Sequence, residues 1–123
     1  MGYHLISPDD IDPLSDRPVD ARSVSDAAGL ENVGLRLYEA SPGEQLPLAY
    51  HYHEQQEEAF YVTEGVLHVE TPDEEYVVEA GNVFVAEPSS PHRAYNPTSA
   101  SGPVRVLAVG APAVSDAEPY ESS

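Results

Sequence analysis

The sequence has no cysteine and no lysine among its 123 residues. Without cysteine, the chain forms neither a disulfide nor a thiolate metal site, so any metal ion must be held by histidine and carboxylate side chains. Its five basic residues are all arginines, and 22 acidic residues bring the formal net charge to -17. A chain without a basic cluster offers no electrostatic footprint for phosphate backbones or anionic lipid headgroups. The composition therefore argues against nucleic acid and membranes as partners.

Long apolar runs are also missing. The longest apolar stretch without a charge, residues 106–115, is about half as long as a membrane-spanning helix of ~20 residues. The N-terminus reaches Asp9 and Asp10 without the basic and apolar regions of a secretory signal. We therefore expect a cytoplasmic protein that is not exported.

An acidic chain with 12 prolines can be disordered, because high net charge opposes collapse. Here, however, 41% of the residues are apolar, which favours a folded protein. An acidic surface suits concentrated salt, where repulsion between charges is screened. The surplus of Asp and Glu without Lys resembles the composition of proteins from salt-accumulating halophilic archaea, which implies a cytoplasm rich in potassium.

Apolar and polar residues alternate along most of the chain, and no segment carries a long apolar face at helical spacing. The pattern predicts short strands over residues 32–39, 58–63, 66–70, 76–79, 83–86, 92–96 and 104–109. Strands of this spacing are typical of an antiparallel sandwich or small barrel. Helix is limited to one short turn over residues 26–28, with Ser25 as its cap and Gly29 as its stop.

The length allows one domain with a single core. Within it we expect three parts. Residues 1–30, rich in Pro and Asp, form an N-terminal arm with short strands, and residues 31–112 form the barrel. Residues 113–123 carry little that can be buried and form a flexible acidic tail.

The residues that carry chemistry begin with His51-Tyr52-His53. On a strand, side chains two residues apart project from the same face about 6.6 Å apart, so both imidazoles can converge on one ion. Glu58 begins the next strand in phase with its apolar residues, where a carboxylate is costly to bury unless it is paired or bound to metal. His92 opens a later strand.

The spacing of these residues resembles the two-motif signature of the cupin superfamily, in particular its small single-domain members. The first motif is matched by Gly43, His51, His53, Glu58 and Gly65, and the second by Gly81, His92 and Asn96. The gap from Gly43 to His51 is two residues longer than usual. Within the second motif, Asn82, Glu87 and Ser89 replace the usual Asp, Pro and Gly.

The resemblance implies an all-β cupin fold, the antiparallel double-stranded β-helix or jelly-roll barrel, with one divalent metal in its mouth. The implied metal ligands are His51, His53, Glu58 and His92. Three imidazoles and one carboxylate suit Mn, Fe, Co, Ni, Cu or Zn, and the ligand types do not select among these metals. The glycines at 43, 65 and 81 are expected to adopt positive φ at the turns that aim the ligand strands.

Two further residues are candidates with two interpretations each. Glu87 could be a second acid/base at the rim of the pocket, or one solvated acid among many. Arg36, which alternates with Leu35 and Leu37, could face the pocket and bind a substrate carboxylate bidentately, or pair with acids on the outer face.

The resemblance also implies a homodimer. Its local support is a stripe of apolar residues, Leu46, Leu48, Tyr50 and Tyr52, which suggests a contact with a second subunit or with the N-terminal arm. For function, one hypothesis is a metal-dependent enzyme, a dioxygenase or an isomerase or lyase, acting on a small molecule. The other is a non-catalytic module that binds or senses a metal or metabolite.

Overall fold

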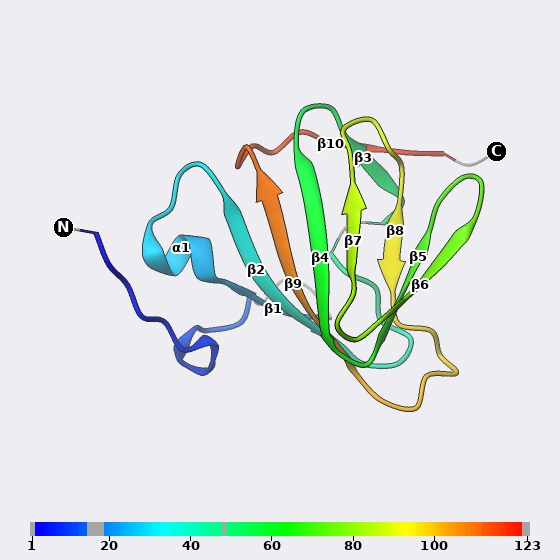
Figure 1. Cartoon of the computed structure of the whole chain (residues 1–123), viewed down its shortest axis with the longest axis horizontal. Helices are drawn as coiled ribbons and strands as arrows, with labels where there is room; N and C mark the ends of the chain where they lie inside the picture. The colour runs from blue at the N-terminus through cyan, green and yellow to red at the C-terminus, as the bar shows by residue number, and fades with distance from the viewer. Residues whose placement is uncertain (1, 15–18, 48, 122–123) are drawn as a thin grey trace.

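The computed structural model describes residues 2–14, 19–47 and 49–121, which form two antiparallel β-layers (Figure 1). The first layer is a five-stranded sheet in the order β1 (Asp20–Ser23), β2 (Gly34–Ala40), β9 (Val104–Ala111), β4 (Glu57–Glu64) and β7 (Val83–Ala86). The second contains the sheet β6 (Glu75–Glu79), β5 (Val66–Glu70) and β8 (Arg93–Tyr95), and the pair β10 (Ala117–Pro119) and β3 (His51–His53). The predicted all-β antiparallel fold with one short helix is confirmed.

A bridge between His51 and His92 joins β3 to the segment that leads into β8. Each residue donates its backbone N–H to the carbonyl of the other, at N···O distances of 3.1 and 2.8 Å. The two histidines are therefore fixed side by side by the backbone before any side-chain contact is considered.

The core lies between the two layers. Phe60 and Val62 of β4 point inward, and the register places Val106 of β9 opposite Val62. Leu67 and Val69 of β5, which belong to the other layer, are also fully buried. The buried cluster comprises Val19, Ala21, Tyr38, Ala40, Leu46, Phe60, Val62, Leu67, Val69, Val78, Ala94, Val104 and Val106. Each large side chain in it contributes about 1.5–3 kcal/mol through burial.

Part of the outer face of the five-stranded sheet is also apolar. Strand β2 turns Arg36 and Tyr38 inward, in the row of Ala108 and Val106 of β9, so Leu35 and Leu37 lie on the outer face. The register extends this face across β9, β4 and β7. We call the eight side chains the outer patch: Leu35, Leu37, Ala59, Tyr61, Val83, Val85, Leu107 and Val109.

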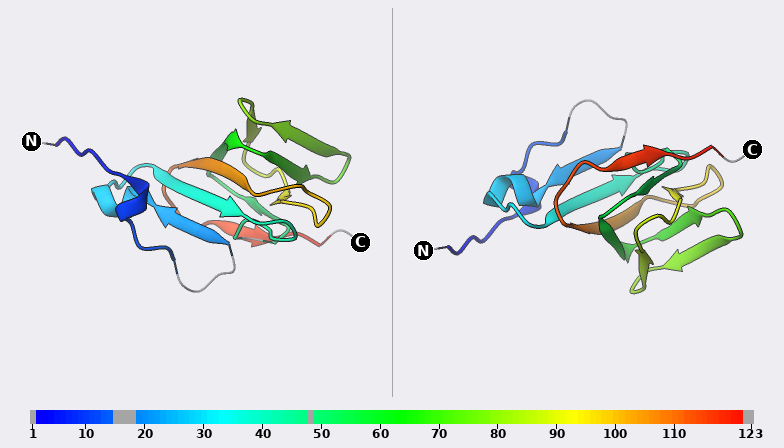
Figure 2. Two further views of the ribbon diagram at one scale, coloured as in Figure 1. Left: turned by 90° about the horizontal axis from the view of Figure 1, so that it is seen from below. Right: turned by 90° about the horizontal axis from the view of Figure 1, so that it is seen from above.

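The N-terminal part contains a short 3₁₀ turn, η1 (Pro8–Asp10), then β1 and the helix α1 (Val24–Ala28). The cap differs from the prediction, because Ser23, not Ser25, accepts the hydrogen bond from the Asp26 N–H at 3.1 Å. Gly29 ends the helix at φ +71°, as predicted. Figure 2 shows α1 at one end of the molecule and the β5–β6 hairpin at the other. No helix in the described ranges is long and apolar enough to span a membrane.

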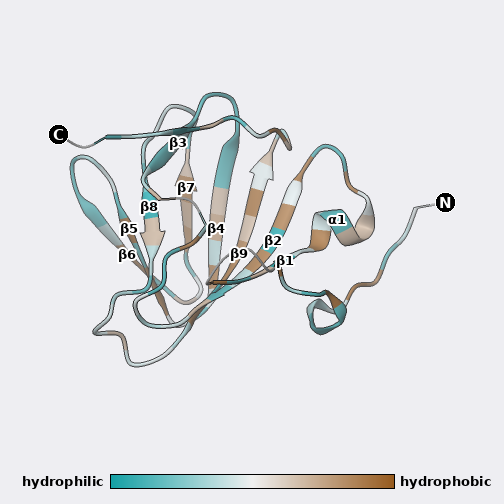
Figure 3. Ribbon diagram, turned by 180° about the vertical axis from the view of Figure 1, so that it is seen from behind, coloured by the Kyte–Doolittle hydropathy of each residue, from teal (hydrophilic) through white to brown (hydrophobic). Residues whose placement is uncertain are grey.

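The segment predicted to be a flexible acidic tail contains strand β10, which pairs antiparallel with β3. The predicted apolar stripe is divided in the structure. Leu46 is buried in the core, Tyr50 packs on Tyr120 with ring centroids 4.9 Å apart, and Leu48 lies outside the described residues. In Figure 3, β3 and the C-terminal segment are largely hydrophilic, whereas β2 and β9 carry hydrophobic stretches.

Candidate metal centre

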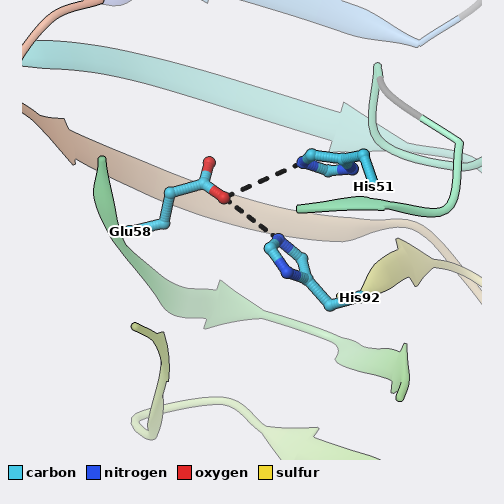
Figure 4. Close-up of side chains that lie close together, drawn as sticks. All are labelled: His51, Glu58 and His92. Atoms are coloured by element: carbon cyan, nitrogen blue, oxygen red, sulfur yellow. Dashed lines mark hydrogen bonds and ion pairs between the residues drawn. The ribbon is translucent and has the colours of Figure 1, made fainter. Parts of the chain in front are cut away.

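Four side chains predicted as metal ligands converge at the mouth between the layers. His51 and His53 come from β3 and His92 from the residue before β8, while Glu58 reaches across from β4 of the five-stranded sheet. All three imidazoles are buried, and the Glu58 side chain is 16% exposed. Figure 4 shows His51 and His92 pointing at the carboxylate of Glu58.

The distances between the ligand atoms are those of a metal site. Glu58 Oε1 lies 3.0 Å from His92 Nε2, 3.1 Å from His53 Nε2 and 3.9 Å from His51 Nε2. One ligand atom each from His51, Glu58 and His92 lies within 4.8 Å of the others. Neighbouring ligands of a six-coordinate ion are about 3 Å apart, since each bond is about 2.1 Å long. His53 joins the group through its contact with Glu58.

The other ring nitrogen of each histidine is tied to an oxygen atom. Nδ1 of His51 lies 2.8 Å from the carbonyl of Ala49, and Nδ1 of His92 lies 2.9 Å from the carbonyl of Ser90. Nδ1 of His53 lies 2.8 Å from Oδ1 of Asp116. Because these oxygens only accept hydrogen bonds, they assign the proton to Nδ1. In a neutral ring, Nε2 then carries a free lone pair that points into the site.

Two of these nitrogens have no hydrogen-bond partner. His51 Nε2 and His53 Nε2 are buried and unsatisfied among the residues that the structure describes. Unpaired buried polar atoms are costly and call for an explanation. A cation at the centre of the group would bond to both nitrogens and to the Glu58 carboxylate, so the donor set fits a divalent transition metal.

The pKa values of the group move in complementary directions. Burial opposes the charged form of His92, but the hydrogen bond to Glu58, the Ser90 carbonyl and the negative charge of Glu58 together raise the pKa of His92. Burial likewise opposes the charge of Glu58, yet the hydrogen bond from His92 and the nearby histidines lower its pKa. Burial lowers the pKa of His51. The hydrogen bond between His92 and Glu58 thus favours the charged form of both side chains.

The site opens into a cavity of about 560 Å³. Arg36 lines this cavity, together with Tyr38 and Phe60 from the inner face of the sheet. Of the two interpretations of Arg36, the structure thus places it on the pocket side. No acidic side chain of the described residues forms an ion pair with it. Asp26 and Glu31, at the α1 end of the cavity, are lining carboxylates that the sequence did not suggest.

Glu87 does not line this cavity. Ala86 takes the inward position opposite Glu58, and the next residue, Glu87, is exposed at a separate surface depression. This depression is also lined by His92, but by none of the other three candidate ligands. Of its two sequence interpretations, the position matches a solvated acid.

The turns around the ligand strands have the expected backbone. Gly43, Gly65 and Gly81 all have positive φ, as predicted. At Gly65 a Cβ atom would lie 2.9 Å from the Cα of Val104, which leaves no room for a side chain. Ser89, in the place where the motif usually has glycine, has φ +65°, and its N–H donates to the carbonyl of His53 at 2.7 Å. A non-glycine residue thus occupies a glycine-type conformation next to a ligand.

Asp116 is a residue of the site that sequence reasoning missed. Its carboxylate accepts from His53 Nδ1 at 2.8 Å and from the backbone N–H groups of Gln55 and Gln56 at 2.6 and 3.0 Å. It lies in the segment predicted to be a tail, 63 residues from His53. The nearby Tyr120 is the one local indication in the sequence that this segment packs against the rest of the protein.

The family comparison gives one match over most of the barrel. The sequence model of Cupin_2, described as "Cupin domain", matches residues 36–110, which is more than half of the chain. No protein of curated function matches the sequence.

Solved structures resemble the whole chain. A cupin-superfamily sugar phosphate isomerase from Silicibacter pomeroyi is 27% identical, with a TM-score of 0.76, over 88% of this chain and 75% of that one. The polyketide cyclase RemF from Streptomyces resistomycificus is 21% identical, with a TM-score of 0.80, over 98% and 87%. A protein with a double-stranded β-helix domain from Klebsiella pneumoniae is 21% identical, with a TM-score of 0.75, over 97% and 98%. These likenesses confirm the predicted jelly-roll fold.

Proposed function

The chain belongs to the cupin domain family, and on this premise we propose that it is a metal-dependent enzyme that acts on a small anionic molecule. The proposed ligands of one divalent transition metal are His51, His53, Glu58 and His92. The observation that carries the proposal is the pair of buried, unpartnered Nε2 atoms of His51 and His53 beside the Glu58 carboxylate. Without a cation, these lone pairs and the carboxylate oppose one another.

A six-coordinate metal held by these four residues would have two further positions for a ligand from the cavity. A divalent metal bound there would supply Lewis-acid polarisation of an oxygen atom of the substrate. The chain's own residues select the substrate: the guanidinium of Arg36 fits a carboxylate or phosphate group, which it can bind bidentately. Tyr38 and Phe60 line the same cavity and give it an apolar side.

An isomerase or lyase reaction is the chemistry that we favour. Arg36 gives the cavity a site for an anionic group, and the 27% identical structure from Silicibacter pomeroyi is a sugar phosphate isomerase. A dioxygenase would instead bind both its substrate and dioxygen at these two positions. The alternative function, a non-catalytic module that binds a metal or metabolite, would need the same ligands and no proton transfer.

Metal analysis tests the proposal directly. Protein purified anaerobically and loaded with Mn, Fe, Co, Ni, Cu or Zn in turn should retain close to one equivalent of at least one metal after desalting. His51→Ala should abolish this retention. His68→Ala is the matched control, because His68 packs on Tyr95 on the outer face of the β5–β8 sheet, opposite to the face that buries Leu67 and Val69. A wild-type protein that retains none of the metals would refute the proposal.

Substrate chemistry is tested by screening. Small sugar phosphates and hydroxy acids are incubated with the metal-loaded protein, and products are followed by NMR in D₂O, where isomerisation exchanges a carbon-bound proton for solvent deuterium. Arg36→Gln should weaken binding of an anionic ligand at least tenfold while metal content stays unchanged. Ligand binding without turnover in the whole panel would favour the non-catalytic alternative.

We also propose a homodimer, formed by the outer patch packing on that of a second copy. Within the patch Tyr61, Val83 and Val85 are 41, 53 and 62% exposed, and no acid lies in its two rows. Ion pairs flank the patch on its own face, where Arg105 binds Glu39, and also occupy the outer face of the other layer, where Arg93 binds Glu70.

Light scattering at high salt tests this interface. Val85→Asp should convert a dimer to a monomer. Val77→Asp is the matched control, since Val77 is 59% exposed but lies on the smaller sheet. A wild-type monomer at all concentrations up to the millimolar range would refute the dimer.

We propose that the large number of acidic residues on the surface is an adaptation to a salt-rich cytoplasm. Most of the acidic residues that the structure describes are exposed, and only Glu58 and Asp116 are placed at the metal site. Surface repulsion of this kind is screened at molar salt, where the Debye length is ~3 Å.

A further inference from the structure

Asp116 is held in place by the strand that follows it. In the pairing of β10 with β3, Ala117 lies opposite His53. Further along, the N–H of Tyr120 donates to the carbonyl of Tyr50 at 3.0 Å, and the two rings pack together. The C-terminal segment thus contacts β3 and the residue before it at two points. The first contact, at Ala117, places the carboxylate of the preceding residue, Asp116, next to His53.

The three hydrogen bonds of Asp116 need a carboxylate. Oδ1 faces Nδ1 of His53, and Oδ2 accepts from the backbone N–H groups of Gln55 and Gln56. An ionised carboxylate has acceptors on both oxygens and no proton to give. It therefore fixes the proton of a neutral His53 on Nδ1 and leaves the lone pair of Nε2 directed at Glu58, 3.1 Å away.

His53 differs in this from the other two histidines. His51 and His92 each bond to a backbone carbonyl two residues earlier, an oxygen that belongs to their own loop. Nδ1 of His53 is held instead by a side chain 63 residues away. Its orientation therefore depends on the C-terminal segment.

We propose that Asp116 is a positioning residue, which sets the tautomer and the orientation of His53 so that Nε2 is ready to bind the metal. This inference rests on the proposed function, since it assumes that His53 is a ligand. Carboxylates that hold a metal-bound histidine typically change metal affinity 10–100-fold when they are replaced. The C-terminal segment is then part of the metal site of this chain.

Asp116→Asn is the sharpest test. The amide has one acceptor oxygen, and the two N–H groups of Gln55 and Gln56 need it. The NH₂ group must then face His53, so Nδ1 becomes an acceptor and the proton moves to Nε2. Glu118→Gln is the matched control, because Glu118 is an exposed acid on β10, the strand that follows Asp116, and lies opposite Tyr52.

Two measurements are made. Calorimetric titration with Co²⁺ gives the metal affinity of each protein, and two-bond ¹H–¹⁵N NMR spectra of the metal-free proteins give the tautomer of His53. We expect Asp116→Asn to bind Co²⁺ 10–100-fold more weakly and to show the proton on Nε2. The wild type and Glu118→Gln should show it on Nδ1, with equal affinities.

The outcomes separate this inference from the proposed function. If the wild type binds Co²⁺ and Asp116→Asn binds it equally well, the positioning role is wrong and the metal site stands. If the wild type binds no metal at all, the proposed function fails. Should Asp116→Asn not fold, the wild-type spectrum alone is decisive, because a proton on Nε2 of His53 in the wild type would overturn the inference.

Discussion

The buried pair of Glu58 and His92 should make the stability of the metal-free protein depend on pH in a way that Glu58→Gln removes. The side chains are 16 and 2% exposed, and His92 Nε2 lies 3.0 Å from Glu58 Oε1. A hydrogen bond between charged partners contributes about 1.5–3 kcal/mol. We therefore work with about 2 kcal/mol, equivalent to roughly 6–10 °C in melting temperature for a chain of this size.

The sign follows from the two pKa shifts. The pKa of His92 is raised in the fold, so its contribution is complete below the unfolded value of about 6.5 and is lost as pH rises through the folded value. The pKa of Glu58 is lowered, so its contribution is present above about 4.3 and is lost on acidification. The pair thus stabilises the fold most between about pH 4.3 and about pH 6.5. Burial lowers the pKa of His51, so its contribution to stability increases with pH, in the wild type and in Glu58→Gln alike.

The assay is urea unfolding of chelator-treated wild type and Glu58→Gln at several pH values from 5.5 to 9. The difference in unfolding free energy should be about 2 kcal/mol in favour of the wild type at pH 5.5, and it should shrink toward zero by pH 9. Glu57→Gln, an exposed neighbour on β4, should show no such difference. A difference that is constant across the range, or that grows with pH, would refute the reasoning.

Three further predictions follow. Ser89→Gly should raise the melting temperature by about 2–5 °C, because the conformational strain of a serine at positive φ costs more free energy than the backbone entropy that a glycine loses on folding. Ser90→Gly is the control and should lower the melting temperature in the same calorimetric scan. Co²⁺ affinity, measured by titration, should increase from pH 5.5 to 8, because the raised pKa of His92 keeps on Nε2 a proton that must leave before the metal binds. The melting temperature of the metal-free protein should rise between low and molar KCl as the repulsion between surface acids is screened, and a scan indifferent to KCl would contradict this.

Much of the site follows from local sequence. His51 and His53 share a face because they are two residues apart on a strand, and the phase of Glu58 with Phe60 puts its carboxylate on the core side. The spacing of His92 relative to these residues has no local explanation, and only the resemblance to a family placed it in the same site. The backbone bridge between His51 and His92 is the structural reason for that spacing.

Asp116 could not be reached in this way. The hydrogen bond to His53 joins residues 63 positions apart, and β10 is three residues long in a segment of low hydropathy. Its position comes from pairing with β3 and from the contact between Tyr50 and Tyr120, which are tertiary interactions without periodicity. Composition alone indicated a tail, because it measures what a segment can bury and not which strand edge is free to pair with it.

Strand β2 shows where alternation is ambiguous and what resolves it. Leu35 and Leu37 fill one phase and Arg36 and Tyr38 the other, so hydrophobicity alone would turn the leucines inward. The structure does the reverse, since Tyr38 shares a buried row with Val106 while Arg36 lines the cavity. The outward leucines are half-buried and adjoin the more exposed Tyr61, Val83 and Val85, while the inward arginine forms no ion pair among the described residues. The reversed phase of this one strand therefore supports two proposals at once, the second copy on the outer patch and the anionic substrate in the cavity.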